Sequence, residues 1–286
     1  MSQMITQPIV NDKLYAIITA MLYADYHMHT PLCGHAVGSP EKYVQQGIKN
    51  GLKEIGFSDH APMVHQRMPG ITMDFHELST YQKMIEDVQQ RFNSQISIKI
   101  ALEADFIPGF EVKTKEMIES YPYDYIIGSV HFIDNWAFDD PASREYWKKY
   151  DVNEVYRKYY ALLRKSAKTG LFDIIGHCDL PKKFGARPTI DLTEDIQATA
   201  QVFKECSVAI EINTAGLRKP IAEMYPAPNC LKIYCEAGVP LTFGSDSHDP
   251  NDVGRDFDKA IALAKSVGYT ESLVFKQRKI EKKVKL

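Results

Sequence analysis

Short apolar segments rich in β-branched residues alternate with longer segments of helical periodicity from about residue 22 onward. This alternation is typical of βαβ units, in which a helix connects two parallel strands of one sheet. A chain of 286 residues is long enough for a barrel of such units in a single domain. The sequence predicts an α/β fold with seven parallel strands, over residues 22–27, 54–59, 97–106, 124–132, 172–179, 208–214 and 240–248.

Start and stop signals mark the helices expected between these strands. Ser39 followed by Pro40 is a typical helix start, and Gly51 is placed to end that helix. Asp151 is expected to cap a helix that runs to about residue 168. The segments 60–74 and 133–150 are expected to form long loops over one face. Further helices are predicted over residues 74–92, 193–205, 229–237 and 255–267.

The charge balance restricts the kinds of partner that the protein can bind, and the cysteines indicate the cellular compartment. The 34 basic and 37 acidic residues give a net charge of -3, so no basic field is available to hold an extended nucleic acid. No apolar segment approaches the roughly 20 residues that span a bilayer, so membrane insertion is not expected. The five cysteines are odd in number and form no C-x-x-C pair, which favours reduced thiols in a cytoplasmic protein.

The first twenty residues precede the first recognisable strand. They have no basic n-region and no convincing cleavage signal. We expect residues 1–20 to be an N-terminal extension whose role is open, and residues 21–286 to form the functional domain. The oligomeric state is not encoded in any feature of the sequence.

Side chains of the kinds that bind metals lie at the carboxyl ends of the predicted strands. In a parallel barrel these ends meet on one face, where barrel enzymes carry their active sites. In an extended chain, an H-x-H or D-x-H pair places both side chains on the same face. Imidazole and carboxylate ligands without thiolates suit Zn²⁺, Mn²⁺ or Fe²⁺. The candidates are His27, His29, His35, His60, Glu103, His131, His177, Asp246 and His248. Of the nine histidines, only His65 and His76 lie away from these positions, and both are expected at the surface.

These motifs resemble those of a known family. The segments YADYHMHTPLCGH, GFSDHAP, LEADF, GSVHF, GHCD and GSDSH, within roughly residues 22–250, resemble the polymerase and histidinol phosphatase (PHP) phosphoesterases. The resemblance implies a distorted (β/α)7 TIM-like barrel and a metallophosphoesterase with two or three divalent ions, of which we favour three. By resemblance, one ion is held by His27, His29, Glu103 and Asp246, a second by His35, His60 and His248, and a third by Glu103, His131 and His177.

Catalysis would centre on Asp246, His248 and Glu103. Ions about 3.5 to 4 Å apart lower the pKa of a shared water towards about 7, so we expect a metal-bridging hydroxide to attack the phosphorus atom. Loops after the fifth and sixth strands carry cations that either bind the phosphate or lie in a solvated basic loop. Asn213 would orient the substrate or tie down its own turn. The cationic candidates are Lys182, Lys183, Arg187 and Arg218.

Within the family, the segments GFSDHAP, DYIIGSVHF, FDIIGHCDLPKKFG and EINTAGLRKP most resemble the histidinol phosphatases. This resemblance implies hydrolysis of L-histidinol phosphate, a small-molecule ester, to L-histidinol and phosphate in histidine biosynthesis. Two alternatives remain open: a PHP phosphoesterase or exonuclease acting on nucleotides or short oligonucleotides, and a non-catalytic metal-binding module that supports a partner. Five residues would enclose the amine and imidazole or lie at the surface: Tyr123, Asp134, Trp136, Asp139 and Asp140.

Overall fold

The computed structural model describes residues 24–286, and the predicted extension over residues 1–20 lies outside them. Seven parallel strands form one sheet in the order β1-β2-β3-β4-β7-β8-β9. All seven were predicted, although several are shorter than expected. Their bounds are β1 Ala24–Asp25, β2 Glu54–Phe57, β3 Ser97–Asp105, β4 Tyr125–Ser129, β7 Ile174–Ile175, β8 Ala209–Asn213 and β9 Leu241–Gly244.

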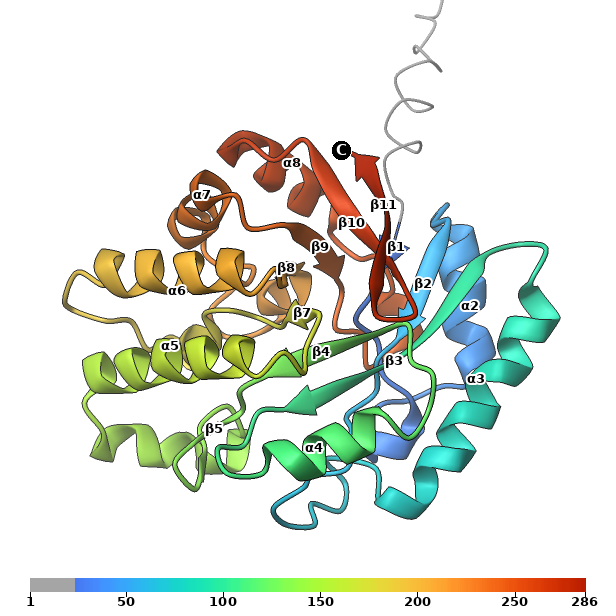
Figure 1. Cartoon of the computed structure of the whole chain (residues 1–286), viewed down its shortest axis with the longest axis horizontal. Coiled ribbons are helices and arrows are strands. Elements are labelled where there is room, and N and C mark those ends of the chain that lie inside the picture. Colours follow the sequence, from blue (N-terminus) through green and yellow to red (C-terminus); the bar gives the residue numbers. More distant parts are fainter. Residues whose placement is uncertain (1–23) are drawn as a thin grey trace, which may run out of the picture.

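The sheet curls until its first and last strands meet. The backbone N–H of Tyr26 donates to the carbonyl oxygen of Phe243 at 3.0 Å, and Met28 forms a parallel bridge with Ser247. Helices surround this nearly closed barrel (Figure 1). The expected distorted (β/α)7 barrel is therefore confirmed, and its first and last strands meet near the carboxyl ends.

All α-helices except α4, which was not predicted, form in the segments where the sequence predicts them. Pro40 is the first residue of its helix, and the carboxylate of Asp151 accepts from the backbone N–H of Asn153 at 2.8 Å. Within residues 24–286, no helix has the length and apolar content that a membrane crossing needs. The helices are α2 Pro40–Lys49, α3 Leu78–Phe92, α4 Glu111–Ile118, α5 Val152–Lys168, α6 Thr193–Glu205, α7 Pro228–Ala237 and α8 Phe257–Val267.

The helix predicted over residues 74–92 begins differently from the prediction. Asp74 and Glu77 form a capping box around a short 3₁₀ turn, η2 Phe75–Glu77, and the α-helix follows at Leu78. A 3₁₀ turn has three residues per turn instead of 3.6, so its side chains leave the apolar stripe of the helix. Phe75 is consequently 52% exposed and does not pack on the core.

Part of the segment 133–150, expected to be a loop, forms regular secondary structure. It contains the hairpin β5 Phe132–Ile133 with β6 Trp136–Ala137, and the 3₁₀ helix η3 Pro141–Lys149. The ring of Trp136 stacks on that of Tyr150, with the ring centroids 4.3 Å apart, and its centroid lies 5.0 Å from that of the Trp147 ring. This aromatic cluster supplies the apolar packing that gives the segment a defined shape.

A C-terminal hairpin, β10 Glu271–Lys276 with β11 Lys279–Lys285, packs beside β9 at the amino end of the barrel (Figure 1). The sequence analysis did not predict it. The backbone N–H of Phe275 donates to the hydroxyl of Tyr26 at 3.1 Å, and Lys99 pairs with Glu281 at 3.3 Å. Because the side chains of Tyr26, Tyr125 and Phe275 fill this end, the opposite, carboxyl end is left for a functional site.

Candidate metal centre

The buried carboxylate of Glu103 lies at the centre of the predicted ligand cluster. It is 2% exposed, and its two oxygens face different histidines. Oε2 lies 2.9 Å from His60 Nδ1 and 3.3 Å from His27 Nε2. Oε1 lies 3.1 Å from His177 Nε2 and 3.7 Å from His131 Nε2. A carboxylate with histidine nitrogens on both oxygens has the geometry of a bridging metal ligand.

The remaining predicted ligands surround Glu103. His29 Nε2 lies 3.3 Å from Asp246 Oδ1, and the rings of His35 and His248 are 4.6 Å apart. The ligand atoms within each of several groups lie within 4.8 Å of one another, close enough to hold one ion. The groups include His27 with His29 and Asp246, His35 with His60 and His248, and Glu103 with His131 and His177. The structure thus brings all nine predicted positions together.

Several buried polar atoms of this cluster have no partner within residues 24–286 at the angles of a hydrogen bond, although some lie close to another ligand atom. They include His27 Nε2, both ring nitrogens of His29, Glu103 Oε2 and His248 Nε2. Native proteins pair nearly all buried polar groups, because an unpaired one costs the desolvation of that group. Buried imidazole and carboxylate atoms left without partners in one cluster therefore fit divalent cations.

Two further carboxylates contact the Nδ1 atoms of predicted ligand histidines and so orient their rings. Asp105 contacts His131 Nδ1 at 3.1 Å, and Glu211 contacts His27 Nδ1 at 2.9 Å. A carboxylate on one ring nitrogen fixes the tautomer so that the other nitrogen is free to bind a metal. The sequence analysis gave these residues no role, although Asp105 shares the end of β3 with Glu103 and Glu211 lies on β8.

Charge coupling within the cluster is strong. Burial would raise the pKa of the Glu103 carboxyl, but His27 and His60 outweigh it and hold this pKa well below its usual range. Burial opposes the positive charge of His131, yet Asp105 outweighs it and raises the pKa of His131 to about 10. Burial and the neighbouring His29 hold the pKa of His248 well below its usual range. Without metal ions, the Glu103 carboxylate therefore stays charged and His131 binds a proton at neutral pH.

The backbone takes disfavoured conformations at two ligand positions. His177 and Asp246 have φ of 24° and 52°, a region that residues with a side chain seldom adopt. Close packing also explains the glycines before them. A Cβ atom on Gly244 would lie 2.4 Å from Glu211 Oε2, and one on Gly176 would lie 2.7 Å from Ser129 Oγ.

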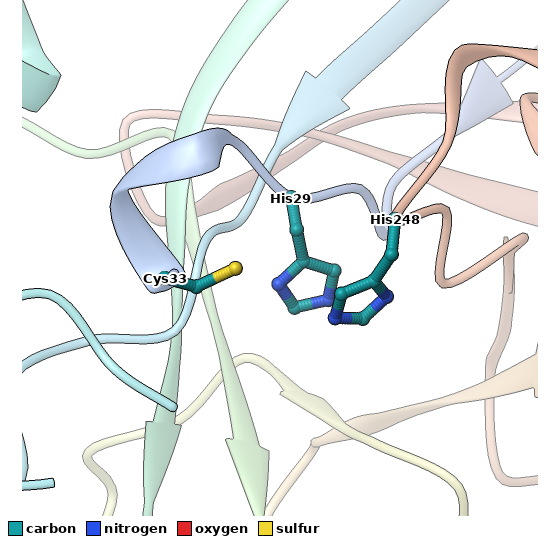
Figure 2. Close-up of side chains that lie close together, drawn as sticks. All are labelled: His29, Cys33 and His248. Carbon is teal, nitrogen blue, oxygen red and sulfur yellow. The ribbon is translucent and has the colours of Figure 1, made fainter. Parts of the chain in front are cut away.

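One cysteine lies within the cluster. The rings of His29 and His248 stack at 3.9 Å, and the sulfur of Cys33 lies beside His29 (Figure 2). Burial and the nearby Asp59 carboxylate raise the pKa of the Cys33 thiol to about 12. Without a bound metal the thiol therefore stays protonated at neutral pH.

A cavity of about 640 Å³ opens above the cluster. Two of the predicted phosphate-binding residues line it. Arg218 is held by the carboxylate of Asp252 at 3.1 Å and by a backbone carbonyl, and Lys183 pairs with Asp139 at 2.9 Å. Lys219, which was not predicted, also lines the cavity and has no ion-pair partner within residues 24–286. Together with Arg144, four cations therefore line the space above the predicted ligands.

The structure does not bring Lys182 and Arg187 to this cavity, which corrects the expectation for both. Lys182 is 2% exposed, and its ammonium group binds Asp179 and Glu223, each at 2.8 Å. Arg187 pairs with the same Glu223 at 3.3 Å. The short 3₁₀ helix η4 Leu180–Phe184 directs the adjacent Lys182 and Lys183 to different cavities, which the sequence alone does not reveal.

Asn213 holds its neighbours. Its side-chain amide donates to Glu211 at 2.9 Å and to Asp246 at 3.2 Å, and its oxygen accepts from the backbone N–H of Ala215 at 2.9 Å. These contacts match the alternative in which Asn213 ties down its turn. It does not line the cavity.

Asp134 is exposed, which matches the alternative of a surface position, whereas the buried positions of Tyr123 and Trp136 match neither expectation. Tyr123 is buried just before β4, Trp136 is buried in the aromatic cluster, and Asp134 pairs with Lys158 on α5. Of the five proposed enclosing residues, Asp139 and Asp140 line the cavity. Finally, His76 is exposed as expected, whereas the His65 ring lies half-buried against Phe110 and Phe132.

Comparisons with known proteins agree with this architecture. The chain is 40% identical over 257 residues to the probable histidinol-phosphatase of Deinococcus radiodurans, covering 90% of this chain and 98% of the relative. It is 28% identical to the histidinol-phosphatase of Bacillus subtilis, covering 82% and 96% of the two chains. The crystal structure of histidinol phosphate phosphatase from Lactococcus lactis, complexed with zinc, L-histidinol and phosphate, superposes with a TM-score of 0.80 at 26% identity, covering 92% and 100%.

Residues 25–215 match the model of the PHP domain. This match spans β1 to β8 and therefore includes most of the predicted ligands. Together with the relative at 40% identity, it establishes that this chain belongs to the PHP domain family.

Proposed function

We propose that this chain hydrolyses L-histidinol phosphate to L-histidinol and phosphate, with residues 21–286 acting as one metallophosphoesterase domain. The observation that carries the proposal is the bridging position of Glu103 between histidines, below a cavity with cationic walls. The relatives named histidinol-phosphatase, matched over nearly their whole length, supply the substrate. The zinc, L-histidinol and phosphate bound to the Lactococcus lactis enzyme agree with both parts of the proposal.

The ligands are assigned to three ions. Imidazole and carboxylate donors suit zinc, manganese or iron. When bound, such ions supply a water of lowered pKa and the positive charge that stabilises a phosphoryl transition state. The first ion takes His27, His29, Glu103 and Asp246, the second takes His35, His60 and His248, and the third takes Glu103, His131 and His177.

The cationic wall of the cavity binds the phosphate group. The guanidinium of Arg218 is held by Asp252 and by the backbone carbonyl of Ser245, so its orientation is set before the substrate arrives. An arginine held in this way recognises phosphate oxygens in a defined direction. Lys219 adds a charge that its own neighbours do not neutralise.

Other residues of the lining suit the rest of the substrate. Met63 and Phe132 offer an apolar surface for an imidazole ring, Phe184 adds apolar surface beside Lys183, and Asp140 presents a carboxylate for the amine. A cavity of about 640 Å³ encloses a small molecule. The size and the mixed walls favour a small phosphomonoester over an extended nucleic acid. We assign the activity to the cytoplasm, because the five cysteines are all unpaired.

A phosphate-release screen tests the proposal. Metal-loaded protein is incubated with L-histidinol phosphate, with nucleoside monophosphates and with a short oligonucleotide, and its metal content is measured by elemental analysis. We expect the highest kcat/KM with L-histidinol phosphate. Higher values with the nucleotides or the oligonucleotide would favour the nucleotide phosphoesterase instead. Release from none of them, with metals bound, would favour a non-catalytic module.

A further inference from the structure

The proposed hydrolysis needs a proton for the oxygen atom that leaves with histidinol. When the bond between phosphorus and this ester oxygen breaks, its electron pair stays on the oxygen of a primary alcohol, and the resulting alkoxide is a strong base. A general acid that protonates such a leaving group contributes about 10²- to 10⁴-fold to the rate. The proposed metal ligands do not provide this proton, because they must be deprotonated to bind metals.

Most other titratable side chains that line the cavity above the metal centre are already engaged. The hydroxyl of Tyr225 is buried, and burial raises its pKa. The carboxylate of Asp140 accepts from the backbone N–H of Ala142 at 2.8 Å. Charged carboxylates act only as acceptors. Three others lie in ion pairs, Asp105 with His131, Asp139 with Lys183, and Asp252 with Arg218.

The four cations of the lining differ in how firmly they hold their protons. Arg144 and Arg218 keep theirs, because a guanidinium group is not deprotonated in proteins. Lys183 is held by Asp139 at 2.9 Å, and this carboxylate outweighs burial and raises the pKa of Lys183. The ammonium group of Lys219 has no ion-pair or hydrogen-bond partner within residues 24–286. Lys219 is therefore the cation of this lining that most readily gives up a proton.

The position and surroundings of Lys219 suit proton donation. It follows the 3₁₀ helix η5 Thr214–Arg218, which begins where β8 ends, and it lines the same cavity as Asp246. Burial lowers the pKa of the Lys219 ammonium, and the neighbouring cations Lys183 and Arg218 act in the same direction against the attraction of Asp246. A general acid works best when its pKa lies near the pH of the reaction.

We propose that Lys219, in addition to attracting the phosphate, is the general acid that protonates the leaving oxygen of histidinol. As the bond from phosphorus to the ester oxygen breaks, its electron pair stays on that oxygen and a proton moves to it from Lys219 Nζ. Water supplies the oxygen that bonds to phosphorus and, through the solvent, the proton that returns to Nζ. This inference rests on the proposed hydrolysis and adds to it the source of the leaving group's proton.

Two esters with different leaving groups test this role. L-Histidinol phosphate releases a primary alcohol, whose oxygen needs the proton, whereas p-nitrophenyl phosphate releases a weakly basic phenolate that leaves without one. We expect Lys219→Met to lower kcat with L-histidinol phosphate by at least about 100-fold, and its loss with p-nitrophenyl phosphate to be at least about tenfold smaller. Lys219→Arg keeps the positive charge but not the transferable proton, so it should restore little of the kcat with L-histidinol phosphate.

Lys42→Met changes an exposed lysine on α2 outside the cavity, and as the matched control it should leave both rates as they are. Metal content and thermal unfolding are measured for every variant. Equal losses with the two esters, or a Lys219→Arg protein as active as the unaltered one on L-histidinol phosphate, would overturn the role and leave Lys219 as a phosphate-binding charge.

Failure of the general acid is distinguishable from failure of the proposed substrate. Should the phosphate-release screen favour a nucleoside monophosphate esterified at its primary hydroxyl, that ester replaces L-histidinol phosphate in the comparison, because it also releases a primary alcohol. The ratio of the two losses then tests Lys219 in the same way.

Discussion

Replacing Glu211 by glutamine tests how the chain orients its proposed metal ligands. The carboxylate is 1% exposed. Its Oε1 accepts from the backbone N–H of His177 and from the amide of Asn213, each at 2.9 Å. Its Oε2 lies 2.9 Å from His27 Nδ1. One buried side chain therefore controls a ligand ring on one strand and a ligand backbone on another.

Glutamine offers one oxygen and one amino group in place of the two oxygens. Because two N–H donors face Oε1, the oxygen stays there and the amino group faces His27 Nδ1. The Nδ1 atom would then have to accept, and the ring proton would move to Nε2, which lies 3.3 Å from Glu103 Oε2. A protonated Nε2 does not bind a metal.

Loss of a group that orients a ligand typically costs about 10- to 100-fold in metal affinity, which corresponds to about 1.4 to 2.7 kcal/mol. Since Glu211 supports two ligand residues, we expect the Glu211→Gln variant to lie near the upper limit, about 100-fold. Zinc affinity is measured by titrating the metal-free protein against a chromophoric chelator. His76→Ala, at an exposed position, is the matched control and should bind zinc as the unaltered protein does.

A Glu211→Gln protein with unaltered zinc affinity would refute the reasoning. Thermal unfolding of the metal-free form separates the remaining possibilities. Lower stability together with unaltered zinc affinity would show that Glu211 serves the fold and not the orientation of the ligands.

Three further predictions concern the centre and its surroundings. Glu103→Gln should lose much of the metal content and nearly all turnover, because the carboxylate serves two ions; unchanged activity would exclude the proposed centre. Because Asp105 outweighs burial and raises the pKa of His131 to about 10, zinc must displace a proton there at pH 7, so apparent zinc affinity should rise from pH 7 towards 10; a flat profile in pH-dependent titrations would contradict this. Gly34→Ala should lower the free energy of unfolding by roughly 1 to 3 kcal/mol in chemical denaturation, since φ is 85° and the new Cβ would meet Gly70 Cα at 2.5 Å; an unaltered midpoint would show that the contact relaxes.

The barrel was predictable because each strand carries a compact apolar signal followed by a helical pattern. The lengths of the strands were harder to predict. Only Ile174–Ile175 of the predicted segment 172–179 pairs as a strand. The chain turns at once after it to place His177 against Glu103, and no local signal marks that point. Strand ends depend on what the following residues contact.

The elements that were missed depend on distant contacts. Helix α4 buries only a few side chains, among them Met117 and Ile118. Its sequence therefore shows little of the alternation between apolar and polar residues that marks a helix. The C-terminal hairpin is held by Tyr26 and Lys99, which are far away in the chain. Neither contact leaves a periodic pattern in the segment that makes it.

The site was predictable as far as residue type and strand-end position determine it. All nine proposed ligands meet because parallel strands bring their ends to one face. The orienting carboxylates Asp105 and Glu211 also lie towards the carboxyl ends of strands, on β3 and β8, so position alone did not separate them from ligands. Lys182 and Lys183 are adjacent in the chain, and only their placement in space assigns them to different cavities.

The left-handed backbone at His177 and Asp246 has a consequence for anyone who would graft this centre onto another barrel. Copying the side chains alone would leave two donors aimed away from the others, because ordinary strand ends continue in the extended region. The grafted unit would have to include each tight turn and the preceding glycine, Gly176 or Gly244, which give those turns room. A transferable metal centre would therefore consist of these short loops in their observed backbone conformations, together with the donor residues that they carry.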